Sequence, residues 1–290
     1  MTLLAHLSWD PSPELFHFNL PLLGRPLLWY GCLFALGFFA AYGVLLYLLR
    51  RYFLTFTQIN KGESFFAVPP QKRATVCAEK LSFYVMIGAI VGARLGDLLF
   101  YQDWHEIVRH PLSLIAVWEG GLASHGGAIG ILIALILFSK RYHFSFWKVL
   151  DFTVIPTALA AVFIRVGNFF NQEILGTPTT LPWGILFLHP ADKGAIVPRH
   201  PAQLYEAGAY LCIFLILLVD WHRRAPFKHR GRTAGLFLIL VFGARFLIEF
   251  LKVEQSIYFN HGSLLTMGQW LSLPFIALGV WLFRKSKRSA

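Results

Sequence analysis

The sequence predicts an all-α integral membrane protein of about seven transmembrane helices, with the N-terminus outside and the C-terminus in the cytoplasm. Two observations predict this fold class. Of the 290 residues, 56% are hydrophobic and only 14% are charged, a composition too apolar for an ordinary soluble domain. The apolar residues also gather in seven runs of about 17–25 residues, the length that crosses the hydrocarbon core of a bilayer.

The predicted spans follow one another along the chain without a repeat or a long linker. Residues 1–290 are therefore predicted to form a single polytopic membrane domain. The first apolar run is long, and its basic pair follows it, so it is expected to remain as a span and not to be a cleaved signal peptide. The spans are predicted at 27–49, 81–101, 121–139, 149–166, 203–220, 233–251 and 266–283.

Basic residues gather in alternate connections, at 50–80, 140–148 and 223–232, and in the tail at 284–288. The positive-inside rule places all four segments in the cytoplasm. The net charge of +11 is divided among these loops and does not form one basic surface, so no nucleic-acid partner is predicted. Topology and anionic lipid headgroups explain the charge.

Two longer stretches interrupt the pattern of spans. The first, 55–80, is polar and is predicted to be a cytoplasmic connection. The second, 172–202, is rich in proline and glycine and lies on the outer side in this topology. Long loops of this kind often cover functional sites, so 172–202 is predicted to form a small extracytoplasmic (periplasmic) cap.

Cysteine usage gives no sign of metal or redox chemistry. Cys32, Cys77 and Cys212 are far apart and lack the paired spacing of metal or disulfide motifs. They are predicted to be small buried hydrophobic residues. The sequence predicts no metal and no cofactor.

The densest polar run follows the fourth predicted span and reads RVGNFFNQE, from Arg165 to Glu173. If the helix continues, Arg165, Asn168 and Asn171 lie along one face. A guanidinium beside a carboxamide is suited to bind a phosphate, because its planar donors match two phosphate oxygens. An arginine that only reaches toward headgroups would not account for the two asparagines and Glu173.

Two other spans carry ionisable residues. His125 lies among five glycines at the start of the third span, and imidazole is the side chain best suited to move a proton near neutral pH. Arg245 and Glu249 are four residues apart in the sixth span. They form either a structural ion pair or, together with Arg165, a doubly positive site for a phosphodiester.

Tyr30 and Glu206 are weaker candidates. Tyr30 opens the first span, where it either belongs to an interfacial aromatic belt or reaches a polar site. Gln203 and Glu206 follow Pro201 and would lie near the mouth of the fifth helix. Helix capping and a chemical role are equally compatible with their position.

Together these segments resemble the phosphatidylglycerol:prolipoprotein diacylglyceryl transferase family of bacterial membrane enzymes. The resemblance covers most of the chain, and its motifs occur in the family's order. They are WYG at 29–31, EGGLASHGG at 119–127, RVGNFFNQEILG at 165–176, RHPAQLYE at 199–206, GARFLIEF at 243–250 and TMGQWLS at 266–272.

The resemblance implies that a diacylglyceryl group passes from phosphatidylglycerol to the sulfhydryl of a lipobox cysteine in a prolipoprotein. This forms a thioether, releases glycerol phosphate and is the first step of lipoprotein maturation. The implied location is the bacterial cytoplasmic (inner) membrane. The implied partners are phosphatidylglycerol, prolipoprotein signal peptides with a lipobox cysteine, and membrane lipids, without a cofactor.

The resemblance also implies roles for single residues. His125, Arg245 and Glu249 are expected to be catalytic, with His125 as the base for a thiol that is mostly protonated at neutral pH. Thr177 departs from the family, which often has arginine there. Residues implied to bind phosphatidylglycerol are Arg165, Asn168, Tyr30, Glu173 and Gly176, to which we add Glu206 from its position at the fifth helix.

Two other classes of function remain open. In a lipid or small-anion transporter, the intramembrane Arg, His and Glu residues would form a permeation path, although the sequence has no inverted repeat. A noncatalytic membrane scaffold would explain the glycines, but it would leave the polar residues without a purpose.

Overall fold

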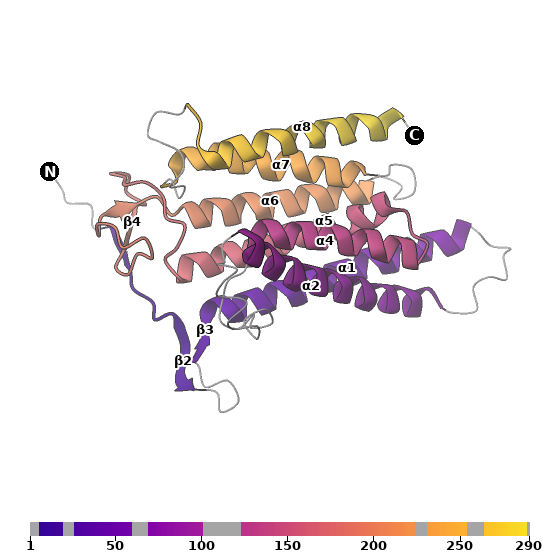
Figure 1. Cartoon of the computed structure of the whole chain (residues 1–290), viewed down its shortest axis with the longest axis horizontal. Helices are drawn as coiled ribbons and strands as arrows, with labels where there is room; N and C mark the ends of the chain where they lie inside the picture. The colour runs from indigo at the N-terminus through magenta and orange to yellow at the C-terminus, as the bar shows by residue number, and fades with distance from the viewer. Residues whose placement is uncertain are drawn as a thin grey trace. The chain divides into compact units, whose positions relative to one another are not determined.

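The computed structural model describes residues 6–19, 26–59, 69–100, 123–223, 231–253 and 264–288 (Figure 1). Contacts within the chain divide it into two compact units. The first unit comprises Met1–Val44 and Thr153–Ala290, and the second comprises Leu45–Phe152. Each unit is considered by itself below.

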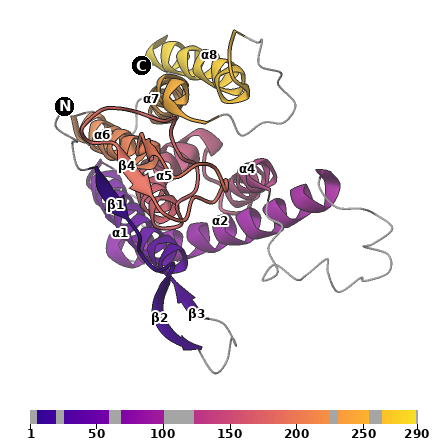
Figure 2. The same ribbon diagram turned by 90° about the vertical axis from the view of Figure 1, so that its left-hand side faces the viewer.

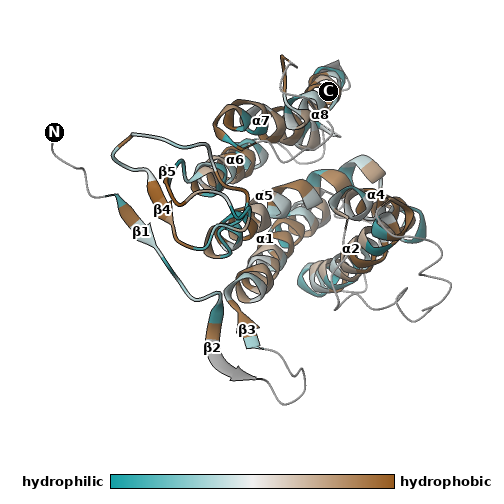
Figure 3. Cartoon of the chain, turned by 60° about the vertical axis from the view of Figure 1, so that its left-hand side comes forward, coloured by the Kyte–Doolittle hydropathy of each residue, from teal (hydrophilic) through white to brown (hydrophobic). Residues whose placement is uncertain are grey.

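Each predicted span overlaps one α-helix of the described residues. Figure 3 colours much of the length of these helices brown, because most of their residues are hydrophobic. A 3₁₀ turn, η3 (Glu249–Leu251), continues the sixth predicted span. The helices are α1 (Trp29–Ile59), α2 (Pro70–Phe100), α4 (Ser124–Arg141), α5 (Phe146–Phe170), α6 (Ala202–Arg223), α7 (Arg232–Ile248) and α8 (Met267–Arg288).

Five segments of the described residues are long and apolar enough to cross a membrane, which supports a multi-pass membrane protein. They are Trp29–Phe56, Pro70–Phe100, Phe146–Phe170, Ala202–Arg223 and Arg232–Leu251. The predicted spans 121–139 and 266–283 correspond to α4 and α8, which do not meet the same criterion. Both helices combine a short apolar stretch with polar residues and a basic C-terminal end.

The prediction of a polar connection over 55–80 is wrong at both ends of that segment. Helix α1 continues to Ile59, and α2 already begins at Pro70. Proline is well tolerated in the first turn of a helix, where its missing N–H is not needed. Hydropathy marks only the apolar part of a helix, so polar extensions such as residues 70–80 are read as loop.

The all-α prediction is incomplete, because the described residues of the first unit also include five short strands. They are β1 (Leu7–Trp9), β2 (Glu14–Asn19), β3 (Pro26–Leu28), β4 (Ile185–Phe187) and β5 (Pro198–Arg199). Strands β2 and β3 form an antiparallel hairpin. In a second sheet, β4 lies between β1, which runs parallel to it, and the antiparallel β5 (Figure 2). These pairings join distant segments, which hydropathy periods do not reveal.

A small apolar core joins the N-terminal strand to the end of α5. Phe169, Leu175, Ile185 and Phe187 are buried together, and Trp9 packs against them. The Trp9 ring centroid lies 4.4 Å from that of Phe169, and Trp9 Nε1 donates a hydrogen bond of 3.1 Å to the Phe169 carbonyl. This core fixes the backbone where the polar residues after α5 begin.

Helices α6, α7 and α8 lie side by side in the first unit (Figures 1 and 2). Glycine at 235 and 279 allows α7 and α8 to approach closely, since a Cβ on Gly279 would lie 2.8 Å from the Gly235 carbonyl oxygen. Thr266 and Gln269 form a reciprocal capping box before α8, with bonds of 3.0 and 3.3 Å. This cap places Gly268 in the first turn of α8.

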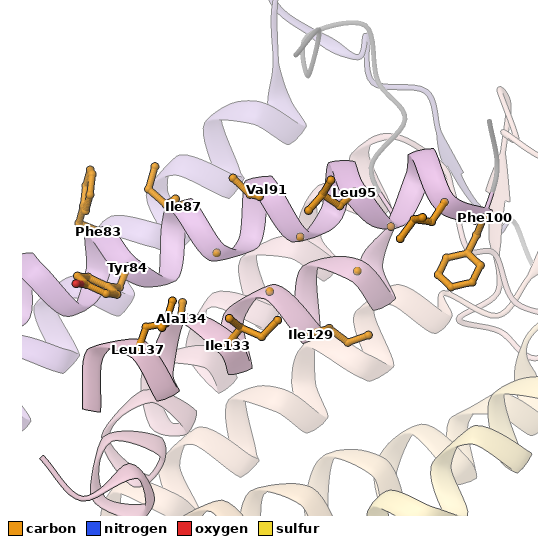
Figure 4. Close-up of a pocket in the computed structure, with 16 residues that line it drawn as sticks. Phe83, Tyr84, Ile87, Val91, Leu95, Phe100, Ile129, Ile133, Ala134 and Leu137 are labelled. Atoms are coloured by element: carbon orange, nitrogen blue, oxygen red, sulfur yellow. The ribbon is translucent and has the colours of Figure 1, made fainter. Parts of the chain in front are cut away.

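In the second unit, α2 and α4 cross through glycines. A Cβ on Gly92 or Gly130 would meet the backbone of the opposite helix. An apolar groove of about 630 Å³ runs between the two helices, with Ile87, Val91 and Ile133 on its walls (Figure 4). Among the described residues, no charged side chain lines it, so this part of the groove suits hydrocarbon and does not suit a charged headgroup.

Candidate active site

Arg165 and Asn168 lie in the last turns of α5 and are joined by a hydrogen bond. Arg165 Nη1 donates to Asn168 Oδ1 over 2.9 Å. Asn168 is buried, so this bond stabilises the guanidinium in one orientation. The predicted proximity of these two residues on one helical face is confirmed.

Glu173 joins this pair through a reversal of the backbone. Gln172 and Ile174 have φ of 50° and 59°, a left-handed conformation that costs roughly 1–2 kcal/mol per residue and is unusual for a branched side chain. The Glu173 carboxylate thereby returns to accept bonds from Asn168 (3.1 Å) and Asn171 (3.0 Å). Although α5 ends at Phe170, the Asn171 N–H still donates to the Gly167 carbonyl over 3.0 Å, so Asn171 follows the helix by one residue and the turn after it brings Glu173 to the site.

Gly167 allows Tyr30 to approach the same cluster. A Cβ at Gly167 would lie 2.8 Å from Tyr30 Cδ2, so the glycine of the RVGNFF segment has a packing reason. Tyr30 lies in the first turn of α1, and its hydroxyl interacts electrostatically with the charges of Glu173 and Arg165. Tyr30 therefore lies at the polar cluster.

Helix α6 contributes two fully buried polar side chains, Gln203 and Glu206. Gln203 Nε2 donates to the Glu173 carbonyl over 2.7 Å. Glu206 Oε2 lies 2.8 Å from Arg165 Nε. That oxygen has no hydrogen bond of good alignment in the described chain, so the contact is an ion pair and not a two-pronged hydrogen bond.

Lys252 is a charged member of the cluster that the sequence did not single out. Its Nζ lies 2.9 Å from Glu206 Oε1 and 3.5 Å from Glu249 Oε2. Glu206 therefore bridges Arg165 and Lys252. The signal that could have found it is the spacing of three residues between Glu249 and Lys252, which permits contact on one helical face.

Gly176 positions Lys252 through the backbone. The two residues form an isolated antiparallel bridge, and a Cβ on Gly176 would meet the carbonyl oxygens of His200 and Leu251. Thr177 extends the contact, with its N–H donating to the Leu251 carbonyl over 2.8 Å. Because Gly176 has no side chain, its backbone can lie in contact with both the His200 segment and the Leu251–Lys252 segment.

Arg245 and Glu249 do not pair with each other in the described residues. The charged partner of Glu249 is Lys252. Arg245 Nε is buried and has no hydrogen bond within the described chain. The Tyr210 hydroxyl interacts electrostatically with Arg245 as well as with Arg165 and Glu206. Arg245 therefore lies near the cluster. A buried donor without a partner is costly, so Arg245 is the cation best prepared to receive an anion.

The space for the Glu249 carboxylate depends on Gly268. A Cβ on Gly268 would overlap that carboxylate. Gly268→Ala is expected to displace Glu249 and to lower the free energy of unfolding by about 1–3 kcal/mol, measured as a lower apparent Tm in detergent. The matched control is Gly208→Ala in α6, where nothing lies within 4 Å of an added Cβ. Equal Tm changes in the two variants would contradict the overlap.

His125 belongs to the second unit, as the second residue of α4, and its side chain is exposed. Within the described residues of that unit it forms no hydrogen bond or ion pair. Its role as a base therefore rests on the sequence and stays a prediction.

The remaining polar residues of RHPAQLYE hold the 172–202 segment in place. Arg199 Nη1 lies 2.8 Å from Asp192 Oδ2. The Tyr205 hydroxyl accepts a bond of 2.9 Å from Trp183 Nε1 and lies 3.2 Å from His200 Nδ1. Only Gln203 and Glu206 of this motif reach the charged cluster.

The cluster balances its charges almost entirely within itself. Its cations are Arg165, Arg245 and Lys252, and its carboxylates are Glu173, Glu206 and Glu249. Buried charges persist only when they are paired. Within the described residues, a phosphate that enters such a site finds the unpaired Nε of Arg245 and two cations, Arg165 and Lys252, that can exchange Glu206 for the new anion.

Comparisons with known proteins agree with these motifs. The family model described as prolipoprotein diacylglyceryl transferase matches residues 17–284. The phosphatidylglycerol–prolipoprotein diacylglyceryl transferase of Tolumonas auensis is 40% identical over 97% of this chain and 98% of its own length. Its namesake from Porphyromonas gingivalis is 40% identical over 100% and 98%. That from Protochlamydia amoebophila is 49% identical over 71% of this chain and 56% of its own length.

Proposed function

Because the chain belongs to the prolipoprotein diacylglyceryl transferase family, we propose that it transfers the diacylglyceryl group of phosphatidylglycerol to the sulfhydryl of a lipobox cysteine in prolipoproteins. The product is a thioether, and glycerol phosphate is released. Membership of this family gives no support to the alternative of a lipid or small-anion transporter.

The reaction requires one bond to form and one to break at a glycerol carbon. The thiolate sulfur attacks the carbon of the diacylglyceryl group, and the carbon–oxygen bond to the phosphate breaks. The phosphate oxygen takes the electron pair and leaves with its glycerol. A thiol of ordinary pKa is mostly protonated at neutral pH, so a base must remove its proton, and we assign this role to His125.

The observation that carries this proposal is the buried cluster of Arg165, Glu206 and Lys252 with the unpaired Nε of Arg245. Negative charge grows on the leaving phosphate as its bond breaks. Donors held in a low-dielectric site stabilise that charge far better than water does. Arg165 and Arg245 would receive the phosphate oxygens, while Asn168 orients Arg165 through their hydrogen bond.

The carboxylates would keep the arginines placed while the site is empty. Glu206 pairs with Arg165 and Lys252, and Glu173 holds Asn168. Tyr30 lies beside this network and can contact a headgroup bound to it. Glu249 would hold the Lys252 ammonium in position through their contact of 3.5 Å. We propose that Gly176 contributes only through its backbone.

We propose that the protein spans the bacterial cytoplasmic (inner) membrane seven times, with the N-terminus outside and the C-terminus in the cytoplasm. Basic residues at 50–80, 140–148, 223–232 and 284–288 support this orientation. The segment 172–202 would then cover the site from outside.

The direct test combines purified protein, phosphatidylglycerol vesicles and a synthetic prolipoprotein peptide that contains its lipobox cysteine. We expect the peptide to gain the mass of a diacylglyceryl group, and a peptide with serine in place of that cysteine to gain none. His125→Gln should lower the rate by about 10²-fold or more while lipid binding remains, whereas His143→Gln, also exposed in the second unit, should not.

Two results would argue against these assignments. A wild-type protein that never modifies the peptide would refute the transferase reaction. A His125→Gln variant that keeps near-normal turnover would refute the base while leaving the reaction intact.

A further inference from the structure

A groove of about 680 Å³ lies at the end of α5 and has no assigned ligand. One wall comes from the N-terminal segment, through Pro11, Pro13 and Leu28. The opposite wall comes from Phe170 and the residues that follow it. The full lining is Pro11, Pro13, Leu28, Phe170, Asn171, Gln172, Glu173, His189 and Ala191, all within the first unit. Its volume is in the range of ligand sites.

Aromatic packing holds the walls of this groove in place, and an exposed Asp10–His189 contact lies at its rim. Trp29 stacks on Phe170 with ring centroids 4.9 Å apart, and Trp9 meets the edge of Phe170 at 5.4 Å. Asp10 Oδ1 lies 2.9 Å from His189 Nε2. A preformed groove loses little conformational entropy when a ligand binds, so the shape is suited to recognition.

Glu173 connects the groove to the phosphate cluster. Its carboxylate lines the groove and accepts the hydrogen bond of Asn171, another lining residue. The same oxygen accepts from Asn168, which in turn binds Arg165. A ligand in the groove therefore ends beside the residues proposed to hold the reacting lipid.

The charge of the groove differs from that of the phosphate cluster. Among the described residues, its lining contains a carboxylate and a histidine, and neither lysine nor arginine. The Glu173 carboxylate would repel an anionic phospholipid headgroup in this groove, whereas the cations of the phosphate cluster lie behind it, on the far side of Asn168. The groove therefore selects against phosphatidylglycerol and in favour of a neutral or basic ligand.

Two carboxamides offer the hydrogen bonds that a polypeptide backbone needs. Asn171 uses its Nδ2 on Glu173, and Gln172 uses its Oε1 on the His189 N–H. Within the described residues, Asn171 Oδ1 and Gln172 Nε2 have no partner. One acceptor and one donor, next to the apolar surface of proline and phenylalanine, match an extended peptide.

We propose that this groove binds the polypeptide substrate, in extended form, next to the cysteine that is modified. The proposal rests on the transferase function above. It assigns the two substrates to separate sites of opposite character, with the anionic lipid on the arginines and the peptide along Asn171 and Gln172. Glu173 lies between them.

The first test detects binding without turnover. Ala191 is replaced by the photo-reactive p-benzoylphenylalanine, and the full chain in detergent is irradiated with a prolipoprotein peptide whose lipobox cysteine is serine. We expect a peptide adduct at 191. The same replacement at Ala195, exposed in the same segment but outside the groove, should give at least about tenfold less. Equal adducts at both positions would overturn the proposal.

The second test measures turnover. Ala191→Trp narrows the groove and should raise the KM for the peptide by about tenfold, the equivalent of 1.4 kcal/mol, while the KM for phosphatidylglycerol changes less than twofold. Ala195→Trp should change neither. A rise in the lipid KM alone, or no change in either KM, would overturn the proposal. Because crosslinking does not depend on lipid transfer, it tests the groove even if the wild-type protein failed to transfer lipid.

Discussion

Arg165→Ala is expected to lower kcat/KM for transfer by roughly 10²–10³-fold, the size of effect seen when one transition-state donor is removed. The substitution removes a guanidinium held by Asn168 and Glu206. It also leaves Glu206 with Lys252 as its remaining cation, so the site carries more negative charge. Both changes weaken the binding of a phosphate, and initial rates with labelled phosphatidylglycerol measure the loss.

Two further variants separate this effect from a general loss of structure. Arg165→Lys keeps the charge without the planar fork and should retain part of the activity. Arg232→Ala removes another buried arginine, which lies 3.4 Å from Asp220 at the opposite end of α7 from Arg245, and should leave the KM for lipid near the wild-type value. If Arg165→Ala kept kcat/KM within threefold, the phosphate role of Arg165 would be wrong.

Glu206→Ala is expected to be the most destabilising single change in the site. Glu206 is fully buried and contacts both Arg165 and Lys252. Its removal leaves two largely buried cations, Arg165 and Lys252, without their shared partner. Breaking a buried ion pair in this way costs about 3–5 kcal/mol. We expect an apparent Tm about 5–15 °C lower in detergent, together with loss of transfer.

A matched variant tests the cause of this loss. In the double variant Glu206→Ala with Lys252→Met, one of the two unpaired cations is removed, so part of the stability should return. Lys252→Met alone leaves Glu206 paired with Arg165 and should cost less than Glu206→Ala. A Tm for Glu206→Ala within about 1 °C of wild type would mean that the bridge contributes nothing to stability.

Local spacing along the sequence predicted part of the site correctly. Arg165 and Asn168 are three residues apart on one helix, and helical geometry alone brings them together. The same reasoning predicted Asn171 on that face if the helix continued; α5 ends at Phe170, but the Asn171 N–H still donates to the Gly167 carbonyl, and Asn171 shares the Glu173 carboxylate with Asn168. Two left-handed residues, Gln172 and Ile174, then return Glu173 to the cluster. Helical periodicity does not encode such a reversal.

The Arg245–Glu249 pair shows the limit of local reasoning. A spacing of four residues permits a contact on one helical face, but it does not choose between local and distant partners. Glu249 instead lies near Lys252, and Arg245 acts on Tyr210 of the neighbouring α6. The motif resemblance implies catalytic roles for both residues without identifying their partners, and these roles stay predictions.

By itself the sequence determined the membrane character of the protein, the approximate positions of its helices, the family and the polar segments after α5 and at the start of α6. These properties depend on composition, on apolar periodicity and on short motifs. All three can be recognised from residues that are close together in the sequence. Tertiary structure alone decided that Glu206 bridges Arg165 and Lys252, that Gly167 admits Tyr30, and that N-terminal prolines form a groove beside Glu173. These contacts join residues far apart in the chain, so they depend on how the elements of the first unit pack and on no local pattern.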